Sequence, residues 1–146
     1  HEEIVAGTPE GEDDENEAIE VVTPATYYLK NGKHYIVYEE VVEGTSGVIK
    51  NRIKINGDEC VEIVKSGLSN SHMIFEKNKK NLTYYQTPYG QMLIGVNTRH
   101  LQVDFEEDKI AVQIDYELDV NHEPMADCKI RMNIVSKDSG KFSVLS

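Results

Sequence analysis

Hydrophobic and polar residues alternate strictly between residues 109 and 120. One face of an extended chain would carry Ile110, Val112, Ile114, Tyr116, Leu118 and Val120, and the other face would carry Ala111, Gln113, Asp115, Glu117 and Asp119. This pattern is typical of a strand with one face against a dry interior and the other in water. We therefore predict a strand here whose apolar side chains point into a core.

Short segments of the same kind, about ten in all, recur along the chain between turn residues. Asn31-Gly32 and Asn56-Gly57 are two-residue hairpin signals, because both residues of each pair accept positive φ. No window keeps a 3.6-residue apolar period. The sequence therefore predicts an all-β fold, a single closed antiparallel β-barrel of mostly up-and-down connections over residues 1–146. Closure would remove the exposed strand edges that invite aggregation.

Two local irregularities are expected. The apolar residues 92, 94 and 96 are at even positions, whereas those at 101, 103 and 105 are at odd ones. One strand can keep both sets on one face only if an extra residue is absorbed between Asn97 and His100, so we predict a bulge there. Proline cannot donate to a strand ladder, so Pro24 is expected to stop a strand over residues 19–23, with a new one resuming at Thr26.

The net charge of −11 is concentrated near the N-terminus. Residues 1–29 hold nine acidic residues and no Lys or Arg, which leaves the remainder at −2. Residues 9–17 are expected to form an acidic, solvated loop, because packed like charges and a glycine disfavour burial and the acids lack the order of a calcium loop. Residues 137–146 carry weak signals and are expected to be a weakly structured tail. The acidic balance argues against nucleic acid as a partner.

Several other classes of site find no support in the sequence. No apolar run is long enough to cross a bilayer, and no secretory leader is recognisable. Cys60 and Cys128 have no metal or redox spacing, so a reduced, cytoplasmic protein is the simpler interpretation. The histidines are scattered, and no phosphate-binding loop or dinucleotide fingerprint is present. We therefore expect no metal and no cofactor.

Three segments together resemble a known family. These are Tyr35-Ile36-Val37-Tyr38-Glu39-Glu40, Thr87-Pro88-Tyr89-Gly90, and the alternating Met92, Ile94, Val96 and Thr98. In order and spacing, over about residues 3–136, they resemble the YwiB-like family of small, uncharacterised bacterial β-barrel proteins, related in fold to the calycins, which include the lipocalins. The resemblance implies a cytosolic, closed antiparallel barrel. It implies no activity, cofactor or catalytic residue.

Glu39 and Glu40 end an apolar strand, and one of them should face the barrel interior. An unpaired carboxylate there would have a raised pKa and could anchor the polar end of a ligand or act as a general base. The alternative is a structural ion pair near the barrel mouth, with Arg99 or Arg131 as its partner. The sequence leaves both interpretations open.

Tyrosine is the dominant aromatic residue, with eight Tyr against three Phe and no Trp. Inside a barrel, Tyr35, Tyr38, Tyr84 and Tyr116 would give an apolar wall with hydroxyl groups, which suits an amphipathic small molecule. The alternative is the ordinary preference of strands for tyrosine. A barrel of this size either fills its centre with side chains or holds one small ligand.

The leading hypothesis is a non-enzymatic protein that binds a small, largely apolar or amphipathic ligand in or at the barrel mouth. One alternative is a protein or nucleic-acid interaction module that uses the charged outer wall, where Lys50, Arg52 and Lys54 form a basic stripe. RNA binding would require aromatic residues among these charges, and this strand face contains none. The other alternative is an enzyme that uses an inward glutamate with a tyrosine.

Overall fold

The computed structural model describes residues 2–7, 22–68 and 70–136, and these ranges contain ten strands. The strands are β1 (Glu2–Gly7), β2 (Val22–Lys30), β3 (Lys33–Val41), β4 (Val48–Asn56), β5 (Cys60–Gly67), β6 (Ser71–Glu76), β7 (Lys80–Thr87), β8 (Gly90–Phe105), β9 (Lys109–Val120) and β10 (Glu123–Ser136). None of these ranges forms a helix, so none supplies a helix that could cross a membrane. The all-β prediction is confirmed for the described residues.

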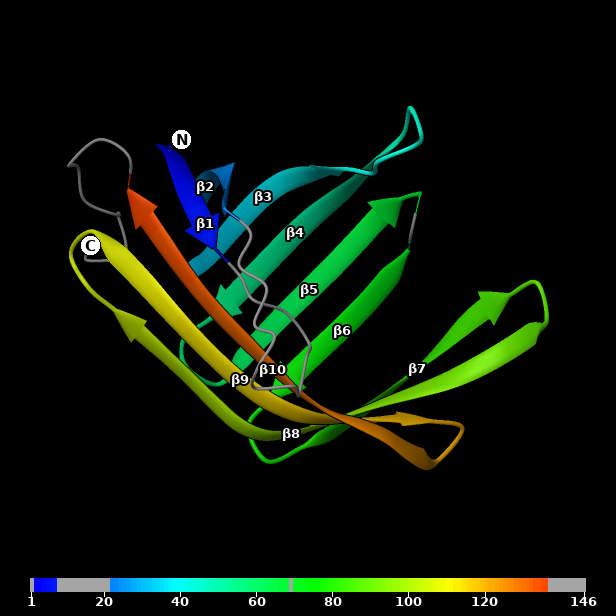
Figure 1. Ribbon diagram of the computed structural model, residues 1–146. Coiled ribbons are helices and arrows are strands. Elements are labelled where there is room, and N and C mark those ends of the chain that lie inside the picture. Colours follow the sequence, from blue (N-terminus) through cyan, green and yellow to red (C-terminus); the bar gives the residue numbers. More distant parts are fainter. Residues whose placement is uncertain (1, 8–21, 69, 137–146) are drawn as a thin grey trace.

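All ten strands belong to one antiparallel sheet, in the order β6-β5-β4-β3-β2-β1-β10-β9-β8-β7. Neighbours in the sheet are neighbours in the sequence, except that β1 pairs with both β2 and β10. Figure 1 shows how the sheet curls over, so that the half formed by β2–β6 faces the half formed by β8–β10. The meander predicted from the short hairpin links is therefore present.

The closed barrel predicted from the sequence is not formed by strand ladders. β6 and β7 are the two ends of the strand order, and no ladder joins them within the described ranges. Side chains of β7 bridge this seam instead. The Tyr85 hydroxyl accepts a hydrogen bond from the N–H of His72 and donates one to its C=O, both at 2.9 Å, and the Asn81 amide donates to the C=O of Ile74 at 3.2 Å. Three backbone groups on the unpaired edge of β6 are thus satisfied without a neighbouring strand.

The space between the two halves is filled by their inward side chains. The most deeply buried side chains come from both halves and include Tyr27, Ile36, Ile53, Ile55, Val61, Phe75, Leu101, Ile110, Ile114 and Ile134. Phe75 of β6 meets Tyr116 of β9 edge-to-face, with ring centroids 4.8 Å apart. On β9, Ile110, Val112 and Ile114 are buried, as the alternating pattern predicts. The centre of the fold is therefore a packed core.

Of the two predicted irregularities, one is confirmed and one is wrong. The register between β8 and β9 shifts between Thr98 and His100, so the bulge is present. Pro24, in contrast, lies inside β2 rather than at the end of a strand. β3 pairs with β2 only from Thr26 onward, so one side of β2 has no partner at Pro24 and tolerates a residue without an N–H. The acidic loop at 9–17 and the tail at 137–146 lie outside the described residues.

Candidate functional site

A polar cluster lies on the inner face where β3, β4 and β5 approach one end of the sheet. Asn51 stands directly opposite Tyr38 on β3 and Lys65 on β5, and its side chain is 1% exposed. Its amide donates a hydrogen bond to Oε1 of Glu40 at 2.7 Å, and the ammonium of Lys65 donates to the same oxygen at 3.1 Å. Glu40 is therefore the inward glutamate, and Lys65 is its charge partner.

The surroundings of Glu40 keep it ionised. Burial, the largest single effect, raises the pKa of Glu40. The hydrogen bonds from Asn51 and Lys65 and the positive charge of Lys65 lower this pKa, and together they outweigh the effect of burial. The pKa of Glu40 therefore lies below its ordinary value. The cluster of carboxylate and ammonium is thus electrically neutral as a whole. The Oδ1 atom of Asn51 is buried and has no hydrogen-bond partner among the residues that the structure describes. One acceptor in the cluster therefore has an unused hydrogen-bonding capacity.

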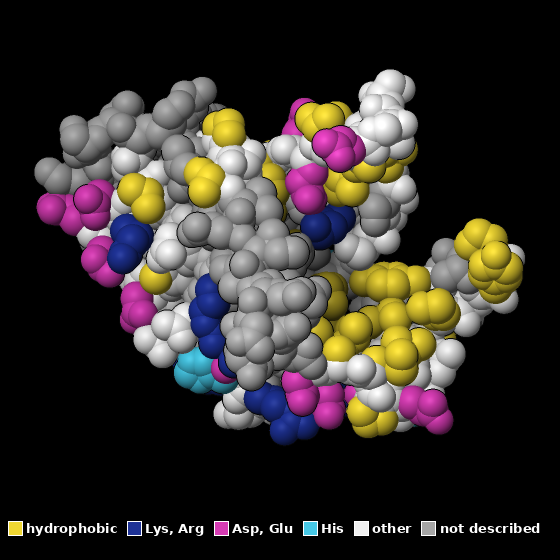
Figure 2. Space-filling view, viewed as in Figure 1, with side chains coloured by type: hydrophobic (Ala, Val, Ile, Leu, Met, Phe, Trp, Pro, Cys, Tyr) yellow, Lys and Arg dark blue, Asp and Glu magenta, His cyan; other side chains and the backbone are white. Residues whose placement is uncertain are grey.

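Apolar side chains continue from this cluster towards the hairpin of β7 and β8. Ile63 and Met73 stand opposite each other on the inner face, and Tyr85 stands opposite Met92 across the hairpin. All four are only partly buried and pack against the core. Figure 2 shows hydrophobic side chains gathered over this hairpin, on the side facing the hollow between the two halves. We call this region, from Glu40, Asn51 and Lys65 to Tyr85 and Met92, the mouth.

Two residues singled out from the sequence meet at the mouth. Tyr38 and Glu40 alternate on the inner face of β3, beside Asn51. Glu39 is exposed on the outer face opposite Lys50, and Tyr35 stands on the same outer face opposite Lys54. Of the two glutamates and two tyrosines that the sequence singled out on β3, only Glu40 and Tyr38 therefore face inward.

The remaining predicted residues lie elsewhere. Tyr116 belongs to the packed core, and Tyr84 is 64% exposed on the outer face of β7. Arg99 pairs with Glu117 at 3.1 Å, and Arg131 pairs with Asp115 at 2.9 Å, both on the outer face. Neither arginine is the partner of Glu40. The predicted ion pair near the mouth exists, but Lys65 supplies its positive charge.

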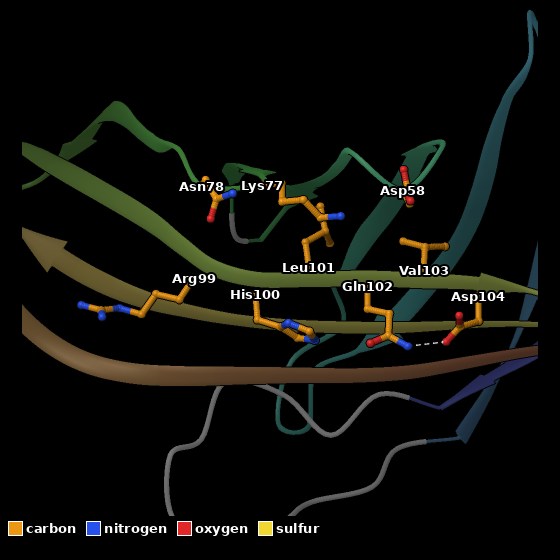
Figure 3. A pocket seen from close by; sticks show the side chains of 9 residues that line it. All are labelled: Asp58, Lys77, Asn78, Arg99, His100, Leu101, Gln102, Val103 and Asp104. Carbon is orange, nitrogen blue, oxygen red and sulfur yellow. Dashed lines mark hydrogen bonds between the residues drawn. The ribbon is translucent and has the colours of Figure 1, made fainter.

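A groove of about 440 Å³ follows the part of β8 that lies beyond its pairing with β7. It is lined by Asp58, Lys77, Asn78, Arg99, His100, Leu101, Gln102, Val103 and Asp104. Figure 3 shows Leu101 and Val103 on one side of the β8 ribbon, with His100, Gln102 and Asp104 on the other. The Gln102 amide donates to Asp104 at 2.8 Å, so these polar groups satisfy each other. A second groove of about 350 Å³ meets the first at Arg99 and runs over β9 and β10.

Metal-binding chemistry finds no site in the described ranges, where no group of three or more His, Cys, Asp or Glu side chains converges. His34 is buried, and its Nδ1 shares a hydrogen bond of 2.8 Å with the Tyr27 hydroxyl. Burial lowers the pKa of His34, so the ring is neutral at neutral pH. His34 is thus a satisfied core residue rather than a metal ligand.

Asn51, Lys65, Tyr85 and Met92 at the mouth were missed from the sequence. Asn51 carries a signal that was available, because it interrupts the inward apolar alternation between Ile49 and Ile53. That Tyr85 and Met92 stand opposite each other follows from the hairpin register at the turn that ends at Gly90. Lys65 lies 25 residues from Glu40, and their contact depends on the pairing of three strands.

Comparison with known proteins places this arrangement in a family. Residues 5–132 match the family model described as "Domain of unknown function (DUF1934)". The uncharacterized β-barrel protein YwiB of Bacillus subtilis (strain 168) is 31% identical over 113 residues, which cover 77% of this chain and 78% of that relative. The crystal structure of the ywiB protein from Bacillus subtilis matches with a TM-score of 0.74 at 23% identity, and covers 92% of both chains. This chain therefore belongs to the DUF1934 family of β-barrel proteins, whose function is unknown.

Proposed function

We propose that the protein is a non-enzymatic binding protein that takes a small amphipathic molecule at the mouth. The single observation that carries this proposal is the inward cluster of Glu40, Asn51 and Lys65 beside partly exposed apolar side chains. Small-molecule sites in proteins are mostly apolar surfaces with a few convergent polar groups. The mouth has both parts, on rigid strands.

The packed core supports a ligand position at the mouth rather than deep inside. Phe75, Ile36 and Ile114 are fully buried by other side chains in the centre. Lipocalins, to which the sequence predicted a likeness, hold one small ligand within the barrel. Here the proposed ligand lies between the polar cluster and the hairpin of β7 and β8, where Met73 and Met92 are only partly covered.

The chemistry of the polar cluster indicates the head group of the ligand. Glu40 and Lys65 neutralise each other, so a charged head would have to compete with an existing ion pair. The buried Oδ1 of Asn51 is an acceptor that lacks a hydrogen-bond partner among the described residues. A hydrogen bond from a ligand to such an acceptor would stabilise the complex. A neutral head with a hydroxyl or amide N–H, carried on an aliphatic or aromatic body, fits this cluster best.

Two further parts of the proposal rest on separate observations. A general base near neutral pH requires a raised carboxyl pKa, and the pKa of Glu40 is lowered, which speaks against the enzyme alternative. No disulfide joins Cys60 and Cys128, which supports a cytoplasmic location, because cysteines of exported proteins are commonly paired.

The four methionines allow a direct test by NMR. With 13C-methyl methionine labelling, Met73 and Met92 report on the mouth, Met132 reports on the core, and Met125 reports on the exposed start of β10. Titration with decan-1-ol is expected to shift the Met73 and Met92 signals and leave the other two unchanged. Decanoate and decylamine carry the same chain with a charged head, and they are expected to bind at least tenfold more weakly.

A pair of variants on one hairpin supplies the control. Met92→Glu places a charge on the inner face of β8 and is expected to abolish the shift at Met73. Tyr84→Glu places the same charge on the outer face of β7, where the tyrosine is 64% exposed, and is expected to leave binding intact. The proposal is wrong if no probe shifts Met73 and Met92, or if Met125 alone responds.

A further inference from the structure

The outer face of β2, β3 and β4 presents positive charges that have no acidic partner. Four basic side chains there, Lys30, Lys33, Lys50 and Arg52, make no ion pair or side-chain hydrogen bond with any described residue. Lys54, next along β4, lies 3.9 Å from Glu62. Glu39 stands opposite Lys50 on this face without forming an ion pair with it, and the basic side chains outnumber the acidic ones, so a net positive charge is available to a partner.

Two tyrosines stand in the middle of these charges. Tyr28 and Tyr35 are opposite each other on β2 and β3, and their rings stack with centroids 4.9 Å apart and planes 6° from parallel. Tyr35 stands directly opposite Lys54 of β4. Both rings are half-buried, so part of each remains at the surface. We call the outward face formed by Tyr28, Lys30, Lys33, Tyr35, Lys50, Arg52 and Lys54 the basic wall.

The arrangement of the sheet bears on one of the two reasons given against nucleic acid, the lack of aromatic residues among the basic side chains. The stripe of Lys50, Arg52 and Lys54 contains no aromatic residue along its own strand, but the sheet brings two tyrosines beside it. Proteins that bind single strands combine a positively charged surface with aromatic rings on which bases stack. Such rings bind unstacked bases, which a duplex does not offer.

We propose that the basic wall binds single-stranded nucleic acid, with a base stacked against Tyr35 and phosphates held by Lys30, Lys33, Lys50 and Arg52. Successive outward residues of one strand are about 6.6 Å apart, so Lys50, Arg52 and Lys54 give a regular row of cations along β4. The mouth opens on the inner face of the same strands, so this binding is independent of the proposed ligand.

Fluorescence anisotropy with fluorescein-labelled oligouridylate of about 12 nucleotides tests the proposal. Binding is expected at low salt and should weaken as salt rises, with a slope of log affinity against log salt of roughly −2.8 for four phosphate contacts. The double variant Lys50→Gln/Arg52→Gln is expected to weaken binding at least tenfold and to flatten the slope by about 1.4. Tyr35→Leu is expected to weaken binding at least fivefold with the slope unchanged.

A matched control lies in the other half of the sheet. Lys129 and Arg131 are two outward residues of β10 with the same spacing as Lys50 and Arg52, and Lys129→Gln/Arg131→Gln is expected to leave binding within twofold. A DNA duplex of two separate complementary strands should bind more weakly than the single-stranded oligouridylate. The proposal fails if oligouridylate does not bind at low salt, or if both double variants weaken it equally. It also fails if polyglutamate competes equally and Tyr35→Leu has no effect, which would indicate an acidic protein partner.

Discussion

The two halves of the sheet differ in where their charged side chains are paired. In β2–β6, Glu40 and Lys65 pair on the inner face, while on the outer face Lys54 pairs with Glu62 and Lys50 and Arg52 form no ion pair with a described residue. In β7–β10 the inward residues of β9 are all apolar or aromatic, and the outer face carries the ion pairs Lys80–Asp119, Arg99–Glu117 and Arg131–Asp115. The charged side chains of the two halves are thus arranged in two different ways.

This difference distinguishes the half to which we assign both proposed binding surfaces from the half whose charged side chains mainly stabilise the fold. A cation held by an adjacent carboxylate is already satisfied, so the outer face of β7–β10 has little to offer a charged partner. An inward ion pair with a nearby open acceptor is suited to orient a small molecule, and unpaired cations on an outer face are suited to phosphates. Both proposed partners therefore bind the β2–β6 half, and the hairpin of β7 and β8 contributes the apolar side of the mouth.

Removing Lys80 should have the largest effect on stability. Asp119 is 4% exposed, although it lies on the outer face, because Lys80 and Leu82 cover it across Gly95. Lys80→Met leaves this carboxylate buried without its partner, and we expect a loss of about 2–3 kcal/mol in the free energy of unfolding, measured with guanidinium. Arg52→Met removes an unpaired cation from the other half and should change stability by less than about 0.5 kcal/mol. Similar losses in both variants would erase the comparison.

The faces of the strands could be predicted from the sequence, because alternation is a local property of the chain. The inward set that begins at Ile110 and the bulge before His100 both follow from whether apolar residues occupy even or odd positions. The Tyr28–Tyr35 pair was also within reach, since a two-residue turn at Asn31-Gly32 fixes the register of its two strands.

Contacts between distant strands could not be predicted in this way. Glu40 meets Lys65 only because two successive hairpins set the register of β3, β4 and β5. Asp119 is in an outward position by alternation, and its burial depends on the missing side chain of Gly95, which lets Lys80 approach. Alternation also cannot tell whether the last two edges of a meander form a ladder, and here side chains of β7 join them instead.

Weakening the seam between the two halves should have an intermediate effect. Tyr85→Phe removes the hydroxyl that bonds both the N–H and the C=O of His72, and we expect a loss of about 1 kcal/mol. Hydrogen exchange of the His72 amide should become faster, because its acceptor is lost. Tyr84→Phe changes the neighbouring, exposed tyrosine of the same strand and should leave both measurements unchanged. Equal effects of the two variants would show that the seam does not depend on Tyr85.

The smallest effect is expected from the inward ion pair, and it depends on pH. Because the pKa of Glu40 is lowered from its ordinary value of 4.5, the unfolded chain takes up the proton first as pH falls. The stability that the ionised carboxylate contributes is therefore present above about pH 4.5 and is lost as pH falls through the lower, folded value. Since the Glu40 side chain is 40% exposed, solvent screens this contribution.

Glu40→Gln should thus reduce stability slightly at pH 7 and give a shallower loss between about pH 5 and pH 3, measured by urea unfolding at each pH. His34 titrates in both proteins, so the difference between the two curves isolates Glu40. The matched change Glu39→Gln, on the exposed outer face, should leave the curve of the unmodified protein unaltered. If Glu39→Gln flattens the curve as much as Glu40→Gln does, the stabilising charge is not on the inner face of β3. The ion pair of Glu40 and Lys65 would then not distinguish the two halves of the sheet.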